Sequence, residues 1–141
     1  MIVLDTNVLV AALRSRTGSS RVLLRHVLGG RCTAGVSVPL FLEYESVLTR
    51  PENLRDFRLS HQDIVAFMDG LASILRPVEI TYLWRPQLRD PCDEMVLEAA
   101  VNGTATHLIT WNIRDFFPAA LRFELRISTP VLFLENDYRS G

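Results

Sequence analysis

The sequence predicts an α/β domain built around a mainly parallel sheet, and two observations lead to that fold class. Short apolar runs of strand length alternate with longer stretches whose apolar residues recur at helical spacing. Some of the short runs stop at acidic or polar residues, as is typical of parallel strands whose carboxyl ends form a ligand site. No repeat, low-complexity segment or linker interrupts the 141 residues, so we expect one domain over residues 1–141.

The first two expected elements are a strand and a helix separated by an acid. Ile2–Leu4 is entirely apolar and too short for a helix, which indicates a buried parallel strand. Asp5 then stands at the carboxyl end of that strand. Thr6 and Asn7 are residue types that cap helices, so we predict a helix through Val8–Leu13.

The next stretch predicts a helix, a strand and a second helix. A helix over Ser20–Leu28 should end at Gly29–Gly30, because glycine readily adopts the left-handed conformation that stops helices. Alternating small and β-branched residues in Cys32–Val38 predict a second strand. A helix over Pro39–Thr49 is then expected to begin with proline in its first turn and to stop before Pro51.

A capping box marks the start of the next helix. Ser60 and Asp63 stand at the spacing at which each side chain can bond the other's backbone amide. The apolar residues expected on the buried face of this helix are Ile64, Phe67, Met68, Leu71 and Leu75. Val78–Leu83 reads either as a strand or as an extended link.

The C-terminal part of the chain predicts two further helices and two strands. Pro91 after the cap-type Asp90 begins a helix. The residues expected on its apolar face are Val96, Leu97, Ala100 and Val101. His107–Thr110 and Arg126–Ser128 read as strands, and a last helix is expected over Pro130–Glu135.

Composition excludes several classes of protein. The formal net charge is −1 and 48% of residues are hydrophobic, so the chain can form a core and has no global attraction to nucleic acid. No apolar run reaches the roughly 20 residues of a membrane helix, and no signal peptide is recognisable, so we expect a cytoplasmic protein. Cys32 and Cys92 have no zinc-binding spacing with the histidines, and we expect both to be buried or half-buried.

The basic residues are unusual because all 15 are arginines. Arginine matches the geometry of phosphate, so clusters that line an acidic pocket could hold an RNA backbone; otherwise they are solvated helix faces. The two clusters are Arg14, Arg16, Arg21 and Arg25, and then Arg50, Arg55 and Arg58.

Scattered carboxylates give the strongest indication of function. They fall beside apolar runs at Asp5, at Glu43 and Glu45, at Asp90 and Asp93, and at Asp115. Mg²⁺ and Mn²⁺ prefer oxygen ligands, and a phosphodiester can be hydrolysed with metal assistance and no protein nucleophile. The pattern therefore predicts a metal-dependent nuclease.

Most of these acids also have a structural interpretation. Asp5 either binds a cation or caps the following helix, because a carboxylate after a buried strand is otherwise costly. Glu43 and Glu45 flank the apolar face of one helix, so periodicity does not choose between them, although Glu45 reads better as an ordinary boundary residue. Asp90 and Asp93 could both serve the start of a helix. We favour Asp93 as the ligand because it heads the apolar face, with Asp90 as a cap.

The segment after the strand at 107–110 adds two candidates. Asp115 is either a ligand of a metal or water or another helix cap. Asn112 could bind a water or orient a ligand. No serine nucleophile motif, P-loop or GxGxxG sequence is present to suggest other chemistry.

Four segments together resemble a known family. IVLDTNVLVAA, the helix that carries Glu43, RDPCDEMVLEAA and ITWNIRDF follow in the order found in the PIN domain, and STPVLFL resembles the ending of that domain. The details look closest to the VapC-like toxins of bacterial toxin–antitoxin systems. The resemblance implies a three-layer α/β/α sandwich with a central parallel sheet of about five strands. It also implies a Mg²⁺- or Mn²⁺-dependent ribonuclease that forms a homodimer and is silenced by a small antitoxin protein.

The resemblance also assigns site residues. By motif position, the implied metal ligands are Asp5, Glu43, Asp93 and Asp115, and the residues implied around them are Asp90, Asn112 and Thr6. Many members have an aspartate where this chain has Asn112, so Asp115 is implied to supply the missing charge. Two alternatives stay open. The domain could bind RNA or a partner protein without cutting, because Asn112 is neutral, or it could act on small phosphoesters as a metal-dependent phosphatase.

Overall fold

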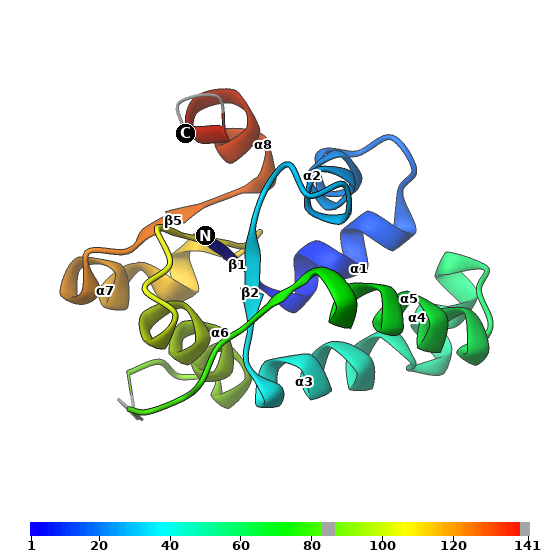
Figure 1. The fold of residues 1–141 in the computed structure, drawn as a ribbon, viewed down its shortest axis with the longest axis horizontal. Coiled ribbons are helices and arrows are strands. Elements are labelled where there is room, and N and C mark those ends of the chain that lie inside the picture. The colour runs from blue at the N-terminus through cyan, green and yellow to red at the C-terminus, as the bar shows by residue number, and fades with distance from the viewer. Residues whose placement is uncertain (83–86, 139–141) are drawn as a thin grey trace.

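A five-stranded sheet forms the centre of the molecule (Figure 1). The computed structural model describes residues 1–82 and 87–138. All strand pairs are parallel, in the order β3-β2-β1-β4-β5. The strands are β1 Ile2–Leu4, β2 Ala34–Val36, β3 Arg76–Pro77, β4 His107–Ile109 and β5 Arg126–Ser128. The strand that carries Asp5 at its end is therefore the central one.

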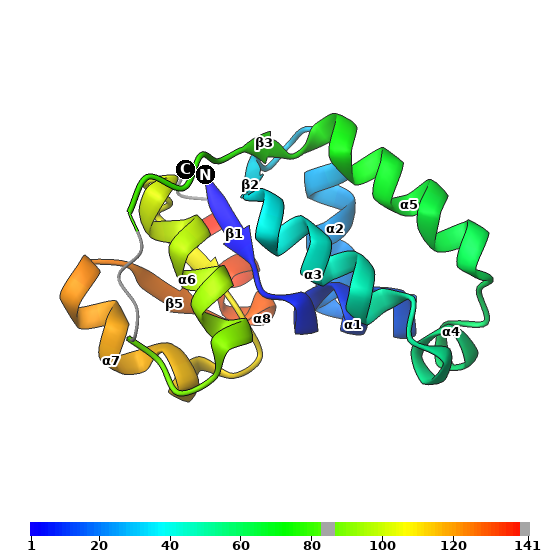
Figure 2. The same ribbon diagram turned by 90° about the horizontal axis from the view of Figure 1, so that it is seen from below.

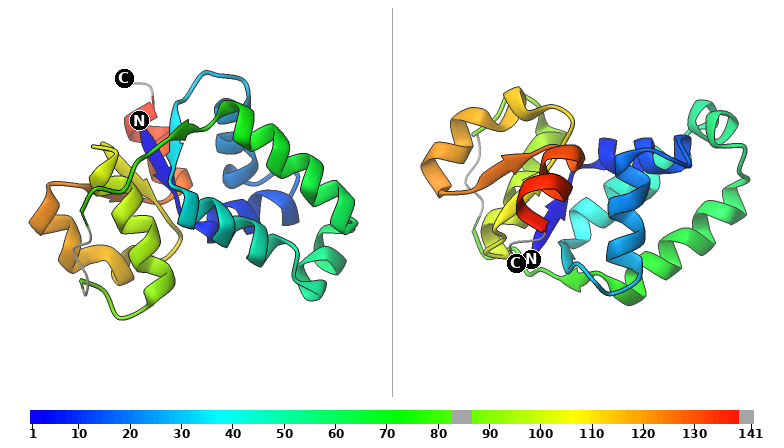
Figure 3. Two further views of the ribbon diagram at one scale, coloured as in Figure 1. Left: turned by 60° about the horizontal axis from the view of Figure 1, so that its bottom comes forward. Right: turned by 90° about the horizontal axis from the view of Figure 1, so that it is seen from above.

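Helices cover both faces of the sheet, which confirms the predicted three-layer α/β/α fold. Seen from below, α3 and α6 lie in front of the strands, whereas α2 and α8 lie in front of them in the opposite view (Figures 2 and 3). The helices are α1 Thr6–Arg14, α2 Ser19–Leu28, α3 Val38–Leu48, α4 Pro51–Phe57, α5 His61–Ile74, α6 Pro91–Asn102, α7 Ile113–Phe123 and α8 Pro130–Leu132, followed by a π-helical turn η1 Phe133–Asp137.

The two central strands are buried on both sides, as their uninterrupted apolar sequences predict. Every residue of β1 and β4 is buried. The ladder continues past the strand ends, where the Asp5 amide donates to the Ile109 carbonyl at 2.8 Å and the Thr110 amide donates to the Ser128 carbonyl at 2.9 Å. Asp5 and Thr110 are thereby held at the same carboxyl edge of the sheet.

Several predicted helix ends are confirmed by their capping contacts. Ser60 and Asp63 form the reciprocal capping box at the start of α5. The Asp90 carboxylate accepts a hydrogen bond from the Cys92 amide at 2.9 Å, with proline in the first turn of α6. Gly30 follows α2 with a φ of 75°, the left-handed conformation that glycine adopts without strain.

Of the two alternatives for Val78–Leu83, the strand is wrong, and a link agrees with the structure over the residues that it describes. The strand in this region is Arg76–Pro77, and residues 78–82 have no regular structure; Leu83 lies outside the described residues. The Val78 amide still donates to the Val36 carbonyl at 2.9 Å, so pairing with β2 ends as the apolar run begins. The strand expected over Cys32–Val38 is likewise shorter, because Val38 already belongs to α3.

Two helices were not predicted. Pro51, taken as a stop signal, also begins α4, since proline suits the first turn of a new helix. In α7, Phe116 is buried and Phe117 is 57% exposed, so the helix packs with one face on the molecule. The helix expected over Pro130–Glu135 is present, but it is α-helical only over Pro130–Leu132 and continues as a π-helix over Phe133–Asp137.

The cysteines agree only partly with the expectation that both are buried or half-buried. Cys32 is half-buried, but Cys92 is exposed, because it lies in the first turn of α6 away from the apolar face; both thiols are free. Within residues 1–82 and 87–138, no helix is long and apolar enough to cross a membrane.

Candidate active site

Asp5 is a buried carboxylate at the end of the central strand. Its side chain is 7% exposed. It occupies the N-cap position of α1 but makes no side-chain cap hydrogen bond. Instead, the Thr110 hydroxyl donates to Asp5 Oδ2 at 2.7 Å across the edge between β1 and β4. Asp5 thus stands at the N-cap position, but the hydrogen bond of its side chain crosses the sheet edge to Thr110.

Opposing influences act on the Asp5 carboxyl. Burial raises its pKa, and the nearby charge of Asp115 adds to this rise. The hydrogen bond from Thr110 and the nearby amides of Thr6 and Asn7 favour the charged form, but burial outweighs them. A cation next to this carboxylate would offset the cost of keeping it ionised.

Asp93 approaches the same region from the first turn of α6. Its pKa is raised to about 6 by burial and by the charges of Asp5, Asp90 and Asp115, with Glu94 adding a smaller effect. Four aspartates from three distant parts of the sequence therefore interact electrostatically at one edge of the sheet. Asp90 is the cap of α6, as predicted, and Asp93 is the residue directed toward the other acids.

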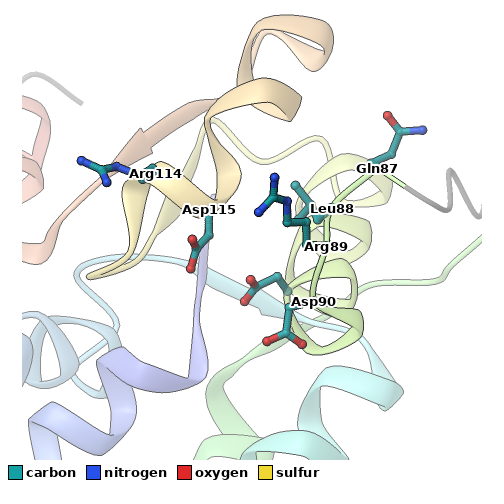
Figure 4. Close-up of a pocket in the computed structure, with 7 residues that line it drawn as sticks. Gln87, Leu88, Arg89, Asp90, Arg114 and Asp115 are labelled. Atoms are coloured by element: carbon teal, nitrogen blue, oxygen red, sulfur yellow. The ribbon is translucent and has the colours of Figure 1, made fainter.

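Asp115 and Asn112 come from the start of α7. Asp115 lies in the first turn and is exposed. In Figure 4 its carboxylate points toward the start of α6, where Asp90 lies. Asn112 occupies the N-cap position of α7 without a side-chain cap hydrogen bond, and its amide donates to the Thr110 hydroxyl at 2.9 Å. Asp115 is thus among the interacting acids, whereas within residues 1–82 and 87–138 no hydrogen bond joins the Asn112 side chain to them.

A pocket of about 780 Å³ opens between α6 and α7 above these acids. Its lining residues are Gln87, Leu88, Arg89, Asp90, Asp93, Arg114 and Asp115. Arg89 points from the α6 side toward α7, and Arg114 points away from the acids (Figure 4). Within the described residues, neither arginine forms an ion pair with the aspartates around it.

The arginine clusters singled out in the sequence do not line this pocket. Arg14 forms an ion pair with Asp56, with 3.5 Å between Nη2 and Oδ2. The Arg21 guanidinium donates from Nε to the Ala12 carbonyl at 2.6 Å. The spacing of arginines in the sequence therefore did not predict which arginines line the pocket.

Glu43 lies half-buried on α3, near the start of α6 rather than in the pocket lining. Partial desolvation raises the pKa of the Cys92 thiol at the start of α6, and the nearby charges of Glu43 and Asp90 raise it further. The next residue, Tyr44, is fully buried and donates from its hydroxyl to the Leu4 carbonyl at 2.5 Å. Tyr44 therefore ties α3 to the strand that ends at Asp5.

The carboxylates of the site are of the chemical type that binds divalent cations, but they are too far apart to enclose one. Among the described residues, no group of three Asp, Glu, His or Cys side chains is arranged to enclose a metal ion. The acids are nevertheless hard oxygen ligands, and their mutual repulsion raises the pKa of Asp93. A bound cation would relieve that repulsion, as in other clusters of like charge.

Two polar residues that support the site were missed in the sequence. Thr110 was expected only as the end of a strand, yet its hydroxyl contacts Asp5 and accepts a hydrogen bond from the Asn112 amide. The Asn7 side chain donates to the same hydroxyl at 3.4 Å. The polar ending of each strand was the available signal, because parallel strands place their carboxyl ends side by side.

These features define an α/β protein with an acidic site at the carboxyl edge of a parallel sheet. The family model described as the PIN domain matches residues 1–114, and the chain belongs to that family. PIN domains form a superfamily of nucleases that typically use divalent metals. The match confirms the resemblance to the PIN domain over residues 1–114, whereas the segment STPVLFL lies beyond the matched residues and the likeness to VapC-like toxins stays a prediction. A comparison with curated proteins found no match.

Proposed function

We propose that the protein is a divalent-metal-dependent endoribonuclease that hydrolyses RNA phosphodiester bonds. The observation that supports this most is the electrostatic interaction of Asp5, Asp93 and Asp115 at the carboxyl edge of the sheet. In this proposal Asp5, Glu43 and Asp93 hold Mg²⁺ or Mn²⁺, and Asp115 helps to hold a second ion or a water. When bound, the ion supplies the positive charge that activates water and stabilises the transition state.

The surrounding residues orient these acids and bind the substrate. Thr110 fixes one oxygen of Asp5 through its hydroxyl, which leaves the other oxygen of the carboxylate for a ligand. Asp90 holds the start of α6 and thereby the position of Asp93, while Thr6 and Asn112 border the site. Arg89 lines the pocket and points from the α6 side toward α7, where it can bind a phosphate of the RNA backbone.

The biological setting forms a further part of the proposal. By resemblance to VapC-like proteins, the chain would be the toxin of a toxin–antitoxin pair, a homodimer and a cytoplasmic protein. A small antitoxin protein would bind it and block cleavage. Co-expression with a short reading frame adjacent to its gene tests this: relief of growth inhibition supports the pairing, and continued inhibition by the active nuclease contradicts it.

Cleavage of mixed RNA by the purified protein in Mn²⁺ tests the enzymatic proposal. Asp5→Asn keeps the size of the side chain and removes its charge. Asp69→Asn makes the same change on α5, at an exposed aspartate outside the pocket. We expect cleavage by the wild type and Asp69→Asn, and none by Asp5→Asn or in EDTA. An Asp5→Asn protein that cuts as fast as the wild type contradicts the assignment.

A second candidate function is a PIN-fold module that binds RNA or a protein without cutting. Two observations favour this alternative. Asn112 is neutral, and no three acids among residues 1–82 and 87–138 are arranged to enclose a metal. RNA binding by folded protein that never cleaves in Mg²⁺ or Mn²⁺ would support it. Hydrolysis of a chromogenic phosphomonoester, with RNA left intact, would instead indicate a phosphatase.

A further inference from the structure

Trp111 exposes its indole beside the acidic site, and the proposed cleavage gives this side chain no role. This residue directly follows Thr110, whose hydroxyl contacts Asp5. Trp111 is 40% exposed, whereas large aromatic side chains are usually well buried. It therefore presents aromatic surface to solvent beside the carboxylates proposed to cut RNA.

Two hydrogen bonds hold Trp111 in place. Its backbone amide donates to Asn7 Oδ1 at 3.3 Å, and its indole Nε1 donates to Ser20 Oγ at 2.9 Å. Ser20 is 2% exposed in the first turn of α2, so it is a fixed acceptor. The polar edge of the indole is anchored while part of the ring stays accessible. Such a ring loses little conformational entropy when a ligand binds.

Trp111 and the pocket between α6 and α7 lie on different sides of Asp5. The pocket is built by residues of α6, α7 and the segment before α6. Trp111 is bonded to α1 and α2, which lie on the other side of β1 from α6 and α7 (Figure 2). A strand of RNA with one phosphate near Arg89 could therefore pass over the acids and reach the indole.

We propose that Trp111 stacks on an unpaired nucleobase and positions single-stranded RNA across the acidic site. The proposal rests on the proposed ribonuclease function. Aromatic side chains bind single strands in this way because every base has a flat π surface. Trp111 is thus a substrate-positioning residue, and the RNA it favours has at least one unpaired base next to the cut.

The test measures binding of a labelled single-stranded oligoribonucleotide to full-length Asp5→Asn protein in Mn²⁺, so that cleavage does not interfere. Trp111→Leu is expected to weaken binding roughly 5- to 100-fold, and Trp111→Phe much less, because phenylalanine can still stack. Tyr82→Leu is the matched control: Tyr82 is 64% exposed beside Asn102 at the far end of α6. Equal affinity of Trp111→Leu and the parent protein overturns the proposal.

An oligoribonucleotide of abasic sites separates stacking from other effects of the substitution. We expect Trp111→Leu and its parent to bind this ligand equally, because the ligand has no base to stack. An undiminished difference between them overturns the proposal. In a Trp84→Phe protein, Trp111 is the only tryptophan, and bound bases should quench its emission. Unquenched emission at saturating RNA overturns the proposal even if Trp111→Leu fails to fold.

Cleavage is measured separately, with Asp5 intact, so that the two proposals can fail independently. Base-dependent binding through Trp111 without cleavage would contradict the ribonuclease and support the stacking role. Metal-dependent cleavage with no change in KM or affinity for Trp111→Leu would contradict the stacking role alone.

Discussion

Replacing Asp93 with asparagine should stabilise the metal-free protein at neutral pH. The Asp93 carboxyl has a pKa of about 6, against 3.8 for an unperturbed aspartate, because burial and three neighbouring aspartates oppose its charge. Since the folded state holds the proton more tightly than the unfolded state, stability is lost as pH rises from about 4 through 6. The Asp93→Asn side chain carries no charge, so the variant avoids this loss.

The size of the effect follows from the pKa shift and the exposure of the side chain. A shift of about two units corresponds to about 3 kcal/mol for a fully desolvated group. Asp93 is only partly buried, so solvent screening lowers this to about 1.5 kcal/mol. A charge in the first turn of α6 is favoured by about 0.5 kcal/mol through the helix dipole, which leaves a net gain of about 1 kcal/mol.

Thermal unfolding in EDTA measures this gain. At pH 7.5, Asp93→Asn should raise Tm by roughly 3–5 °C, and the gain should shrink at pH 4.5. Mn²⁺ should stabilise the wild type and Asp69→Asn more than Asp93→Asn, because the variant loses a ligand. A variant that is less stable than the wild type in EDTA, or a gain that is the same at both pH values, would refute the reasoning.

Three further changes test the surroundings of the site. Thr110→Val removes the hydroxyl bonded to Asp5 with little change in shape, and should weaken Mn²⁺ affinity about 10–100-fold by calorimetry; it should also lower Tm in EDTA, because the buried Asp5 carboxylate and the Asn112 amide lose a hydrogen-bond partner. Unchanged Mn²⁺ affinity contradicts the orienting role. Arg89→Gln should weaken RNA binding while Mn²⁺ affinity is retained. The slope of log RNA affinity against log salt concentration should become shallower by about one; an unchanged slope argues against a phosphate contact. Tyr44→Phe should lower the free energy of unfolding in urea by about 1–3 kcal/mol, because it removes a buried hydrogen bond to Leu4; a loss near zero would show that the bond contributes little.

The core of the fold could be predicted because its signals are local. Ile2–Leu4 and His107–Ile109 are apolar runs that parallel sheets bury on both sides, and the starts of α5 and α6 depend on cap residues next to them in the sequence. The α7 helix was harder to predict, because Pro118 interrupts the run and proline usually breaks a helix interior. The strand near residue 78 was misplaced because pairing with β2, not hydropathy, decides which residues form it.

The acids of the site could be predicted, but their partners could not. A parallel sheet brings its carboxyl ends together, so the meeting of Asp5 with Asp115 follows from the order of the elements. The hydrogen bond from Thr110 to Asp5 joins residues 105 positions apart, and no local pattern signals it. Arg89 lines the pocket because of the course of the segment before α6, whereas the more clustered Arg14 pairs with Asp56 elsewhere.

The central claim is that the aspartates at the carboxyl edge of the sheet hold the cation that cleavage requires. The most direct test follows RNA cleavage and Mn²⁺ binding in the same samples across a Mn²⁺ titration, for the wild type, Asp5→Asn and Asp69→Asn. We predict that cleavage rises in step with Mn²⁺ occupancy in the wild type and Asp69→Asn, and that Asp5→Asn shows neither at the same concentrations. Identical binding and cleavage curves for Asp5→Asn and the wild type would contradict the claim.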